Sequence, residues 1–592
     1  MVPLPSCAVP RSTPRPVSLW LLTLVLAAAA MAWALRHAPL GVAVADDYAF
    51  LDRLSFQHPL DVFDSMGGSF YWRPLSRQAY FSVVGRVLLA APWIVPLLHG
   101  AVLALTSFLL YRIGRKLGWT PLACAFVAAS PVLAEPSRVL LTWPSAAQHL
   151  LAMFLVVLAL HEGVHGRAWR AAAAAWLGLL AHESSAVVLP ILPVLAQGPW
   201  WRRVLPALAA AGLWQVGYRI ALGHGVLLPH HEGELAPDLF TALRLGVVAA
   251  LGLEDQGGAR GATLLVGYGL VVIAAALVGA FGRKARQRVT TAAPGILVAL
   301  AAYVAGTLPL AVLLPDWNAW RDTVPGLALG VGLTAFVALA SAELGALFVV
   351  LRVVALLGAM PAVTQVDTFA PTTTSDMSFA RITRLQRIAD GARRAVLTDL
   401  RDRTPPLEIR TVHNPRMSEV AFHGSRALRV WLDDSTATWR SLGGQTGLYE
   451  APGPVIAYDL DTTLWQAVLL QPQAVALLRR GMDESAALRF RAAESLFVLA
   501  GQAQPRRSMT FQSFLDANIG RTKFFQDQFA EADSLNESSR ILGGEDTNYW
   551  ALRGAIEFMR GDRAAALRSA KRSLEFMPTN PFAQSVAERA SH

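Results

Sequence analysis

The chain has 592 residues, of which 54% are hydrophobic and only 16% are charged, and its mean hydropathy is +0.40. A soluble domain carries about a quarter charged residues, so this composition excludes a wholly soluble protein. The net charge of +10 does not indicate nucleic-acid binding, because Lys and Arg lie in short segments between apolar runs, where they set membrane orientation. Two cysteines, Cys7 and Cys124, are too few for a disulfide framework or a metal cluster.

The apolar runs predict an α-helical polytopic membrane domain over residues 1–360 with about eleven transmembrane helices. Arg11 and Arg15 precede the first run, which favours a cytoplasmic N-terminus and an uncleaved anchor over a signal peptide cleaved after Ala45. Every basic cluster between the runs then falls on the cytoplasmic side. The expected spans and apolar segments are 18–35, 92–111, 119–133, 146–160, the two halves of 171–197, 205–222, an interfacial 239–253, 262–281, 293–314, 323–341 and 343–360.

A soluble region follows the last span. Residues 361–465 predict a small α/β segment, with a helix over Phe379–Leu400 and strands at Ala427–Leu432 and Val455–Tyr458. With the N-terminus inside, this region lies outside, and the Ala- and Arg-rich composition suits a bacterial inner-membrane protein with a periplasmic C-terminal region.

Residues 466–592 have the pattern of α-helical hairpins. The 34-residue tetratricopeptide pattern fits one repeat well, at Trp550, Gly554, Gly561, Ala566 and Pro578. Gly520 and Ala532 stand 34 residues before Gly554 and Ala566, which indicates a second repeat, and a weaker third hairpin is expected near 466–500. Plain amphipathic hairpins are the alternative interpretation.

Four short motifs carry ionisable residues, and all four fall on the non-cytoplasmic side of the expected topology. Solvated loops or interfacial anchors would also explain each of them alone, but together they predict one outward-facing site. The motifs are Asp46-Asp47, Tyr71-Trp72-Arg73-Pro74-Leu75, His182-Glu183-Ser184, and the stretch from Asp316 to Asp322 that contains Arg321. His230-His231-Glu232 lacks a defined ligand spacing and predicts a solvated loop, so no metal site is assigned.

These motifs resemble those of the C-type (GT-C) membrane glycosyltransferases, and most closely the protein O-mannosyltransferase-like proteins that carry transmembrane helices followed by tetratricopeptide repeats. The resemblance implies a donor sugar on a polyprenyl phosphate and an acidic residue of the first outer loop that serves as the catalytic base. One departure is His182, where the family usually has Lys before Glu. A fixed cation is thereby replaced by a residue that titrates near neutrality.

The expected mechanism follows from the residue types. Asp46 or Asp47 is the general base for the acceptor hydroxyl, and Arg73 and Arg321 hold the phosphate leaving group. The remaining expected substrate contacts are Tyr71, His182, Glu183 and Asp316. Direct displacement would invert the anomeric centre. The sequence specifies no cofactor, although a divalent cation would suit this chemistry.

Two alternatives remain open. The acceptor hydroxyl is either on a protein or on a lipid or envelope glycan, and the hairpins favour a polypeptide because stacked helical pairs suit extended peptides. A transporter or a non-enzymatic membrane scaffold is the second alternative. A transporter would more often show inverted repeats and mid-membrane charges, whereas the charges here collect at one surface.

Overall fold

The computed structural model describes residues 16–57, 61–64, 71–196, 198–223, 238–254, 256, 258–311, 317–363, 377–400, 408–411, 416–441 and 456–592. The chain divides into two compact units. The first, called the apolar unit, comprises Met1–Ala43, Gln57–Ala362 and Ser375–Ile382. The second, called the mixed unit, comprises Val44–Phe56, Val363–Thr374 and Thr383–His592. The mixed unit therefore includes a segment that the sequence analysis placed in an outer loop of the membrane domain.

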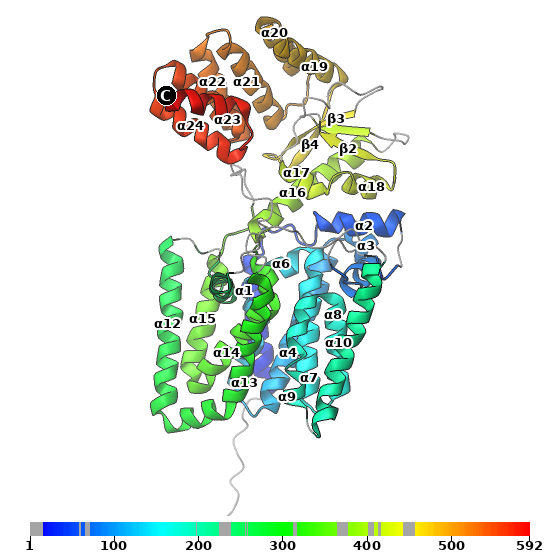
Figure 1. Cartoon of the computed structure of the whole chain (residues 1–592), viewed down its shortest axis with the longest axis vertical. Coiled ribbons are helices and arrows are strands. Elements are labelled where there is room, and N and C mark those ends of the chain that lie inside the picture. The colour runs from blue at the N-terminus through cyan, green and yellow to red at the C-terminus, as the bar shows by residue number, and fades with distance from the viewer. Residues whose placement is uncertain are drawn as a thin grey trace, which may run out of the picture. The chain divides into compact units, whose positions relative to one another are not determined.

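The apolar unit is a bundle of helices joined by short connections (Figure 1). Its α-helices are α1 (Pro16–Ala34), α3 (Tyr80–Ala90), α4 (Ile94–Lys116), α5 (Pro121–Leu133), α6 (Pro136–Thr142), α7 (Ala147–Val164), α8 (Ala168–Ala181), α9 (Leu192–Leu195), α10 (Trp200–Gly223), α11 (Leu239–Ala250), α12 (Gly258–Phe281), α13 (Arg283–Thr307), α14 (Thr323–Ala340) and α15 (Ala342–Gly358). The described part of the unit also contains a short π-helix, η1 (Leu75–Ala79), and three short 3-10 helices, η2 (Pro144–Ala146), η3 (Glu183–Val188) and η5 (Ala319–Asp322).

Five helical stretches are long and apolar enough to cross a membrane, and α5 with α6 adds a sixth if that pair, bent by 60°, is one span. The expected eleven spans are not confirmed among the described residues. Several apolar runs form helices of only 10–17 residues, namely Leu19–Ala34, Ala168–Ala181, Glu183–Leu195 and Leu239–Ala250. The bend falls at Pro136, whose missing N–H ends the preceding helix.

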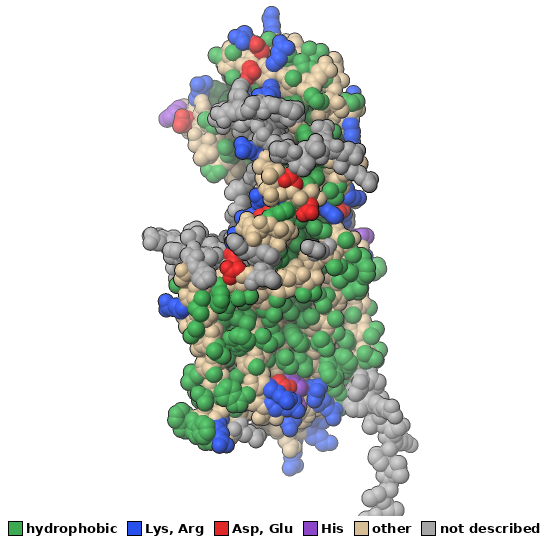
Figure 2. All heavy atoms as spheres, turned by 90° about the vertical axis from the view of Figure 1, so that its right-hand side faces the viewer, with side chains coloured by type: hydrophobic (Ala, Val, Ile, Leu, Met, Phe, Trp, Pro, Cys, Tyr) green, Lys and Arg blue, Asp and Glu red, His purple; other side chains and the backbone are tan. Residues whose placement is uncertain are grey.

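Burial separates the long helices into two classes. In the spans that contain α7 and α14, 72% of the apolar window is buried, whereas only 22% is buried in α12. Large apolar side chains such as Leu208, Leu270 and Leu297 therefore remain exposed. Figure 2 shows a broad apolar surface on one side of the bundle, with Lys and Arg gathered at one end of it. So large an exposed apolar surface is compatible with a protein that sits in a bilayer.

The mixed unit contains a four-stranded sheet with strand order β2-β1-β3-β4. The strands are β1 (Glu408–Thr411), β2 (Thr438–Ser441), β3 (Ile456–Asp461) and β4 (Gln466–Leu470). β1 runs parallel to β2 and β3, and β4 is antiparallel to β3. Helices α2 (Asp46–Phe56), α16 (Phe379–Asp399), α17 (Arg416–Phe422) and α18 (Arg426–Leu432) accompany the sheet.

The strand expected at Ala427–Leu432 is wrong, because this segment forms α18. Its buried residues are Ala427, Leu428 and Trp431, at the spacing of one helix face. The helix expected at Phe379–Leu400 is present as α16, and the strand expected at Val455–Tyr458 begins at Ile456 as β3.

Seven helices form the rest of the mixed unit: α19 (Pro472–Ala486), α20 (Phe490–Gln502), α21 (Met509–Phe524), α22 (Phe529–Gly543), α23 (Thr547–Met559), α24 (Arg563–Phe576) and α25 (Pro581–Ser591). Three helix pairs share one crossing. In each, a glycine of the first helix lies against the carbonyl of a buried alanine twelve residues later, at Gly481 and Ala493, Gly520 and Ala532, and Gly554 and Ala566. A Cβ on these glycines would lie 3.4, 3.3 and 3.1 Å from the alanine oxygens, so the helices approach closely there.

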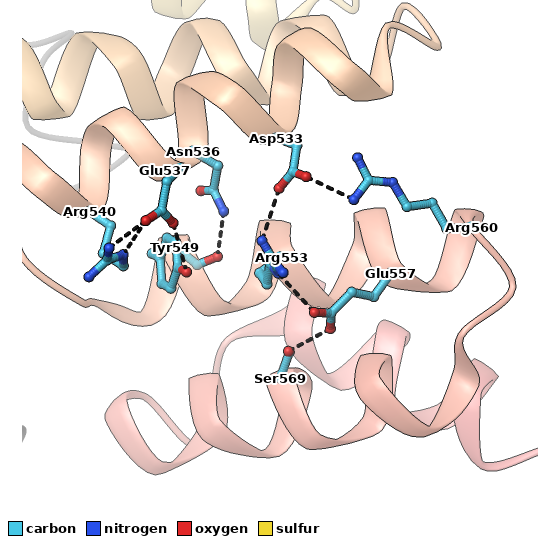
Figure 3. Close-up of polar contacts among 9 residues, drawn as sticks. All are labelled: Asp533, Asn536, Glu537, Arg540, Tyr549, Arg553, Glu557, Arg560 and Ser569. Carbon is cyan, nitrogen blue, oxygen red and sulfur yellow. Dashed lines mark hydrogen bonds and ion pairs between the residues drawn. The ribbon is translucent and has the colours of Figure 1, made fainter.

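Polar contacts join consecutive pairs (Figure 3). Arg553 of α23 binds Asp533 of α22 at 3.1 Å and Glu557 at 2.8 Å, and Glu557 accepts a hydrogen bond from Ser569 of α24. Asn536 donates to the carbonyl of Tyr549 at 3.1 Å. The contacts fix the order in which the pairs stack.

The sheet and the helical pairs share a hydrophobic core. One cluster contains Ala457 and Leu470 of the strands together with Leu478, Phe497 and Phe511 of the helices. Beside it, the carboxylates of β3 accept hydrogen bonds from the start of α21, where Met509 N–H donates to Asp461 at 2.8 Å. The sequence analysis divided this region at residue 465, whereas residues 383–592 belong to one compact unit.

Candidate functional site

The loop that carries Arg73 is fixed by its neighbours in the apolar unit. The Trp72 indole N–H donates to the Val62 carbonyl at 2.8 Å. The Trp72 ring lies against α10 at Gly217, where a Cβ would lie 2.1 Å from the ring. Ser76 then donates to the carbonyl of Ala181, the last residue of α8, at 2.7 Å. Because these contacts fix Trp72 and Ser76, on either side of Arg73, the Arg73 side chain lies near the end of α8.

Arg73 and Glu183 form a two-pronged ion pair. The Arg73 Nε donates to Glu183 Oε2 at 2.8 Å, and its Nη2 donates to Oε1. A third guanidinium nitrogen, Nη1, donates to the side chain of Gln148 on α7 at 2.7 Å. The Tyr71 ring lies 4.0 Å from the guanidinium carbon. Three segments distant in sequence therefore converge on one cation, in the parallel geometry that arginine and carboxylate favour.

His182 stands between α8 and η3 as a neutral ring. Its Nδ1 accepts a hydrogen bond from the Ser184 backbone N–H at 3.1 Å. An imidazolium donates from both nitrogens, so this contact selects the neutral tautomer with the proton on Nε2. The ring is 4.2 Å from that of His149, centroid to centroid. In this arrangement His182 can donate a hydrogen bond from Nε2.

The segment Asn318–Arg321 reaches the same place. The Trp320 ring lies 4.9 Å from the ring of His149 and 5.5 Å from that of Trp143. The Arg321 guanidinium lies 5.3 Å from the Trp320 ring centroid and is within electrostatic range of both His149 and His182. Seven side chains thus form what we call the Arg73 cluster, namely two arginines, two histidines, one glutamate, one glutamine and one tryptophan: Arg73, Gln148, His149, His182, Glu183, Trp320 and Arg321.

Asp322 faces the other side of η5. It is buried, and neither carboxylate oxygen has a hydrogen-bond donor among the described residues. Its Oδ2 lies against two glycines, since a Cβ at Gly246 or Gly326 would come within 3.2 or 2.7 Å of it. A carboxylate without a donor in an apolar bundle is rare and marks a candidate functional group.

The Asp46-Asp47 motif belongs to the mixed unit, so the expectation that it meets Arg73 stays a prediction. The two carboxylates differ sharply. Asp47 is fully buried and accepts a hydrogen bond from the Val44 N–H at 2.8 Å, which ties down the start of α2. The Asp46 side chain is 54% exposed, and its Oδ1 lies 3.9 Å from Nδ1 of His423.

A third aspartate of α2 forms the main contact with α18. Asp52 is buried and pairs with Arg429 at 2.8 Å, while Tyr48 accepts a hydrogen bond from the Trp431 indole at 3.0 Å. Burial raises the pKa of Tyr48 above its ordinary value. Burial also lowers the pKa of His423, which faces Asp46, Arg426 and Asp52. The sequence analysis did not identify Asp52, because its partner lies 377 residues away.

Some expected features lie outside the described residues, among them Asp316 and the segment that contains His230-His231-Glu232. Among the residues that are described, no three His, Cys, Asp or Glu side chains are grouped so that they could hold a metal ion. Cys124 is a free, buried thiol.

The structure brings together Tyr71, Arg73, His182, Glu183 and Arg321, which the sequence analysis had proposed as parts of one site. It adds Gln148, which the sequence analysis did not single out because an amide next to an apolar run is common. No family model matches the chain, and a search of the curated proteins finds no relative.

Proposed function

We propose that this chain is a membrane glycosyltransferase of the C type, which moves a sugar from a polyprenyl-phosphate carrier to an acceptor hydroxyl with inversion. The proposal is supported above all by the Arg73 cluster, in which cations and neutral donors from the first loop, α7, the end of α8 and η5 converge. Fold likeness alone would not assign an activity.

The chemistry fits a phosphate leaving group. When the bond from the anomeric carbon to the phosphate oxygen breaks, both electrons stay on that oxygen, and the acceptor oxygen forms the new bond. Preorganised cations such as Arg321 and Arg73 stabilise the growing negative charge. Glu183 holds Arg73 in place, and His182 can donate its Nε2 proton in a hydrogen bond to a phosphate or sugar oxygen.

Asp46 is the better choice for the general base. The acceptor must give up its proton to a carboxylate within hydrogen-bond reach, so the base has to be accessible. The Asp46 side chain is exposed, whereas the Asp47 carboxylate is committed to the backbone at Val44. We therefore assign Asp46 the base role and Asp47 the role of positioning α2.

The test is sugar transfer in membranes that contain the full chain and a labelled polyprenyl-phosphate sugar. Asp46→Asn should lower the transfer rate by about 10²–10⁴-fold, and Arg321→Ala by about 10²–10³-fold. Asp433→Asn is the matched control, since Asp433 is exposed in the same unit and its left-handed φ of 51° suits Asn. Full activity of Asp46→Asn would overturn the base assignment, and activity lost only in Asp322→Asn would move it to Asp322.

The helical pairs favour a polypeptide acceptor. Their repeated Gly–Ala crossing is compatible with tetratricopeptide-like stacking, which presents an extended surface. In the same assay, label that enters protein supports this acceptor, and label that enters only lipid or glycan supports the alternative. Absence of transfer to any acceptor, with the protein folded, would favour a scaffold or transporter.

A further inference from the structure

A basic pocket lies at the end of the apolar unit where α7 turns into α8 and where α10 begins. Its volume is about 470 Å³. Three arginines and two tryptophans line it, and no acidic residue does; the lining residues central to it are Arg167, Arg170, Trp169, Trp201, Arg202 and Leu205. The pocket takes no part in the proposed sugar transfer, because none of its residues belongs to the Arg73 cluster.

Two of the three cations are available to a ligand. Arg167 pairs with Glu162 at 3.2 Å. Arg170 and Arg202 are exposed, and among the described residues neither has a carboxylate within ion-pair distance. The Arg202 guanidinium lies 4.8 Å from the Trp201 ring centroid, which restricts its position over the pocket. Two guanidinium groups without neighbouring acids favour an anion, and a phosphate in particular.

The apolar surroundings favour a phosphate that carries a lipid tail. Trp169 and Trp201 are exposed by 61% and 48%, as expected of side chains at the level of lipid headgroups. From Leu205 in the pocket wall, exposed apolar side chains continue along α10 at Leu208 and Val216. A soluble phosphate would make no contact with these apolar side chains, whereas an acyl chain would pack against them.

We propose that this pocket binds the phosphate headgroup of an anionic phospholipid, with an acyl chain along Leu205, Leu208 and Val216 of α10. Basic pockets between helices at a membrane surface bind such headgroups. The turn between α12 and α13, which carries further Lys and Arg residues, lies at the same end of the bundle (Figure 1). These charges attract anionic lipids nonspecifically, whereas the pocket binds one lipid molecule specifically.

The experiment measures the first lipid bound to the purified full chain by native mass spectrometry, with phosphatidylglycerol as the probe and phosphatidylcholine as the neutral comparison. Arg170→Ala with Arg202→Ala should weaken the first binding step for phosphatidylglycerol about 25-fold, since each arginine near an anionic headgroup contributes about fivefold. Binding of phosphatidylcholine should not change.

The matched control is Arg286→Ala with Arg288→Ala, which removes the same charge from exposed positions outside the pocket. The control should change the binding less than twofold. If both double variants lost the same affinity for phosphatidylglycerol, the effect would be nonspecific attraction and the proposal would be overturned. Unchanged affinity in Arg170→Ala with Arg202→Ala would also overturn it. Displacement of the lipid by millimolar inorganic phosphate would identify a soluble-anion site instead.

Arg202→Lys covers the case in which the double variant does not fold. It keeps the charge but removes the flat guanidinium that lies by Trp201, so an intermediate loss is expected. If phosphatidylglycerol binding were unchanged in Arg202→Lys and also in Arg170→Ala, the proposed headgroup site would be contradicted.

Discussion

The Arg73–Glu183 pair makes an asymmetric prediction about stability. The Arg73 side chain is only 8% exposed, whereas that of Glu183 is 37% exposed. Removing the acid strands a buried cation, but removing the cation leaves an acid that water can reach. We therefore expect Glu183→Gln to lower the free energy of unfolding by about 2–3 kcal/mol, below the 3–5 kcal/mol of a fully buried pair. Arg73→Met should lower it by only about 1 kcal/mol.

The double variant completes the cycle. With Arg73→Met present, Glu183→Gln no longer strands a charge, so the double variant should be more stable than Glu183→Gln alone. Reversible unfolding of the reconstituted protein by denaturing detergent, followed by circular dichroism, measures all four states. Glu343→Gln, at an exposed glutamate of the same unit that accepts a hydrogen bond from Ser341, should lower stability much less than Glu183→Gln does. Strictly additive losses, or a larger loss in Arg73→Met than in Glu183→Gln, would refute the reasoning.

Three further predictions concern the mixed unit and use the unfolding of the full chain. Gly554→Ala should lower its stability by about 1–2 kcal/mol, because the new Cβ meets the Ala566 carbonyl at 3.1 Å. Arg429→Ala should cost about 2–3 kcal/mol, because it leaves buried Asp52 with only the longer contact to Arg426 at 4.0 Å, and adding Asp52→Asn should restore part of the loss. Burial lowers the folded-state pKa of His423, so the unfolded chain binds the extra proton and stability should fall as pH drops below about 6.5, a fall that His423→Asn should reduce.

Each of these predictions has a control. Gly501→Ala, on α20, meets only the flexible end of the Leu515 side chain and should change stability less than Gly554→Ala does. Arg394→Ala removes a mostly exposed arginine paired with Asp390 and should matter less than Arg429→Ala. A pH dependence of the same size in wild type and His423→Asn would show that other groups carry it.

Sequence periodicity predicted the features that depend on local pattern. Apolar runs located the long helices α4, α7, α12, α13 and α14, because a helix must bury or immerse about 20 apolar residues to span a bilayer. The apolar pattern also indicated breaks after residue 133 and within 171–197. It could not predict the 60° bend between α5 and α6 or the turn η3 after His182, because the geometry of a break depends on the backbone and packing at that point.

The site was predictable only in its charged residues. Arg73, Glu183 and Arg321 stand out because charges are rare in apolar surroundings. Gln148 and His149 complete the cluster from within an apolar helix, where their partners come from segments far away in sequence. The run at Ala427–Leu432 is rich in apolar residues, which favoured a strand. Its buried residues have the spacing of a helix face, and the segment forms α18.

The membership of α2 in the mixed unit constrains how the chain can be made. Tyr48 finds its partner Trp431 only 383 residues later, so the ribosome must synthesise almost two thirds of the protein first. At about 5–20 residues per second, that interval lasts about 20–80 s. During this interval α2 has been synthesised, but α18, against which it packs, has not. A truncated C-terminal fragment would accordingly need residues 44–56 supplied as a separate peptide before it could close its core.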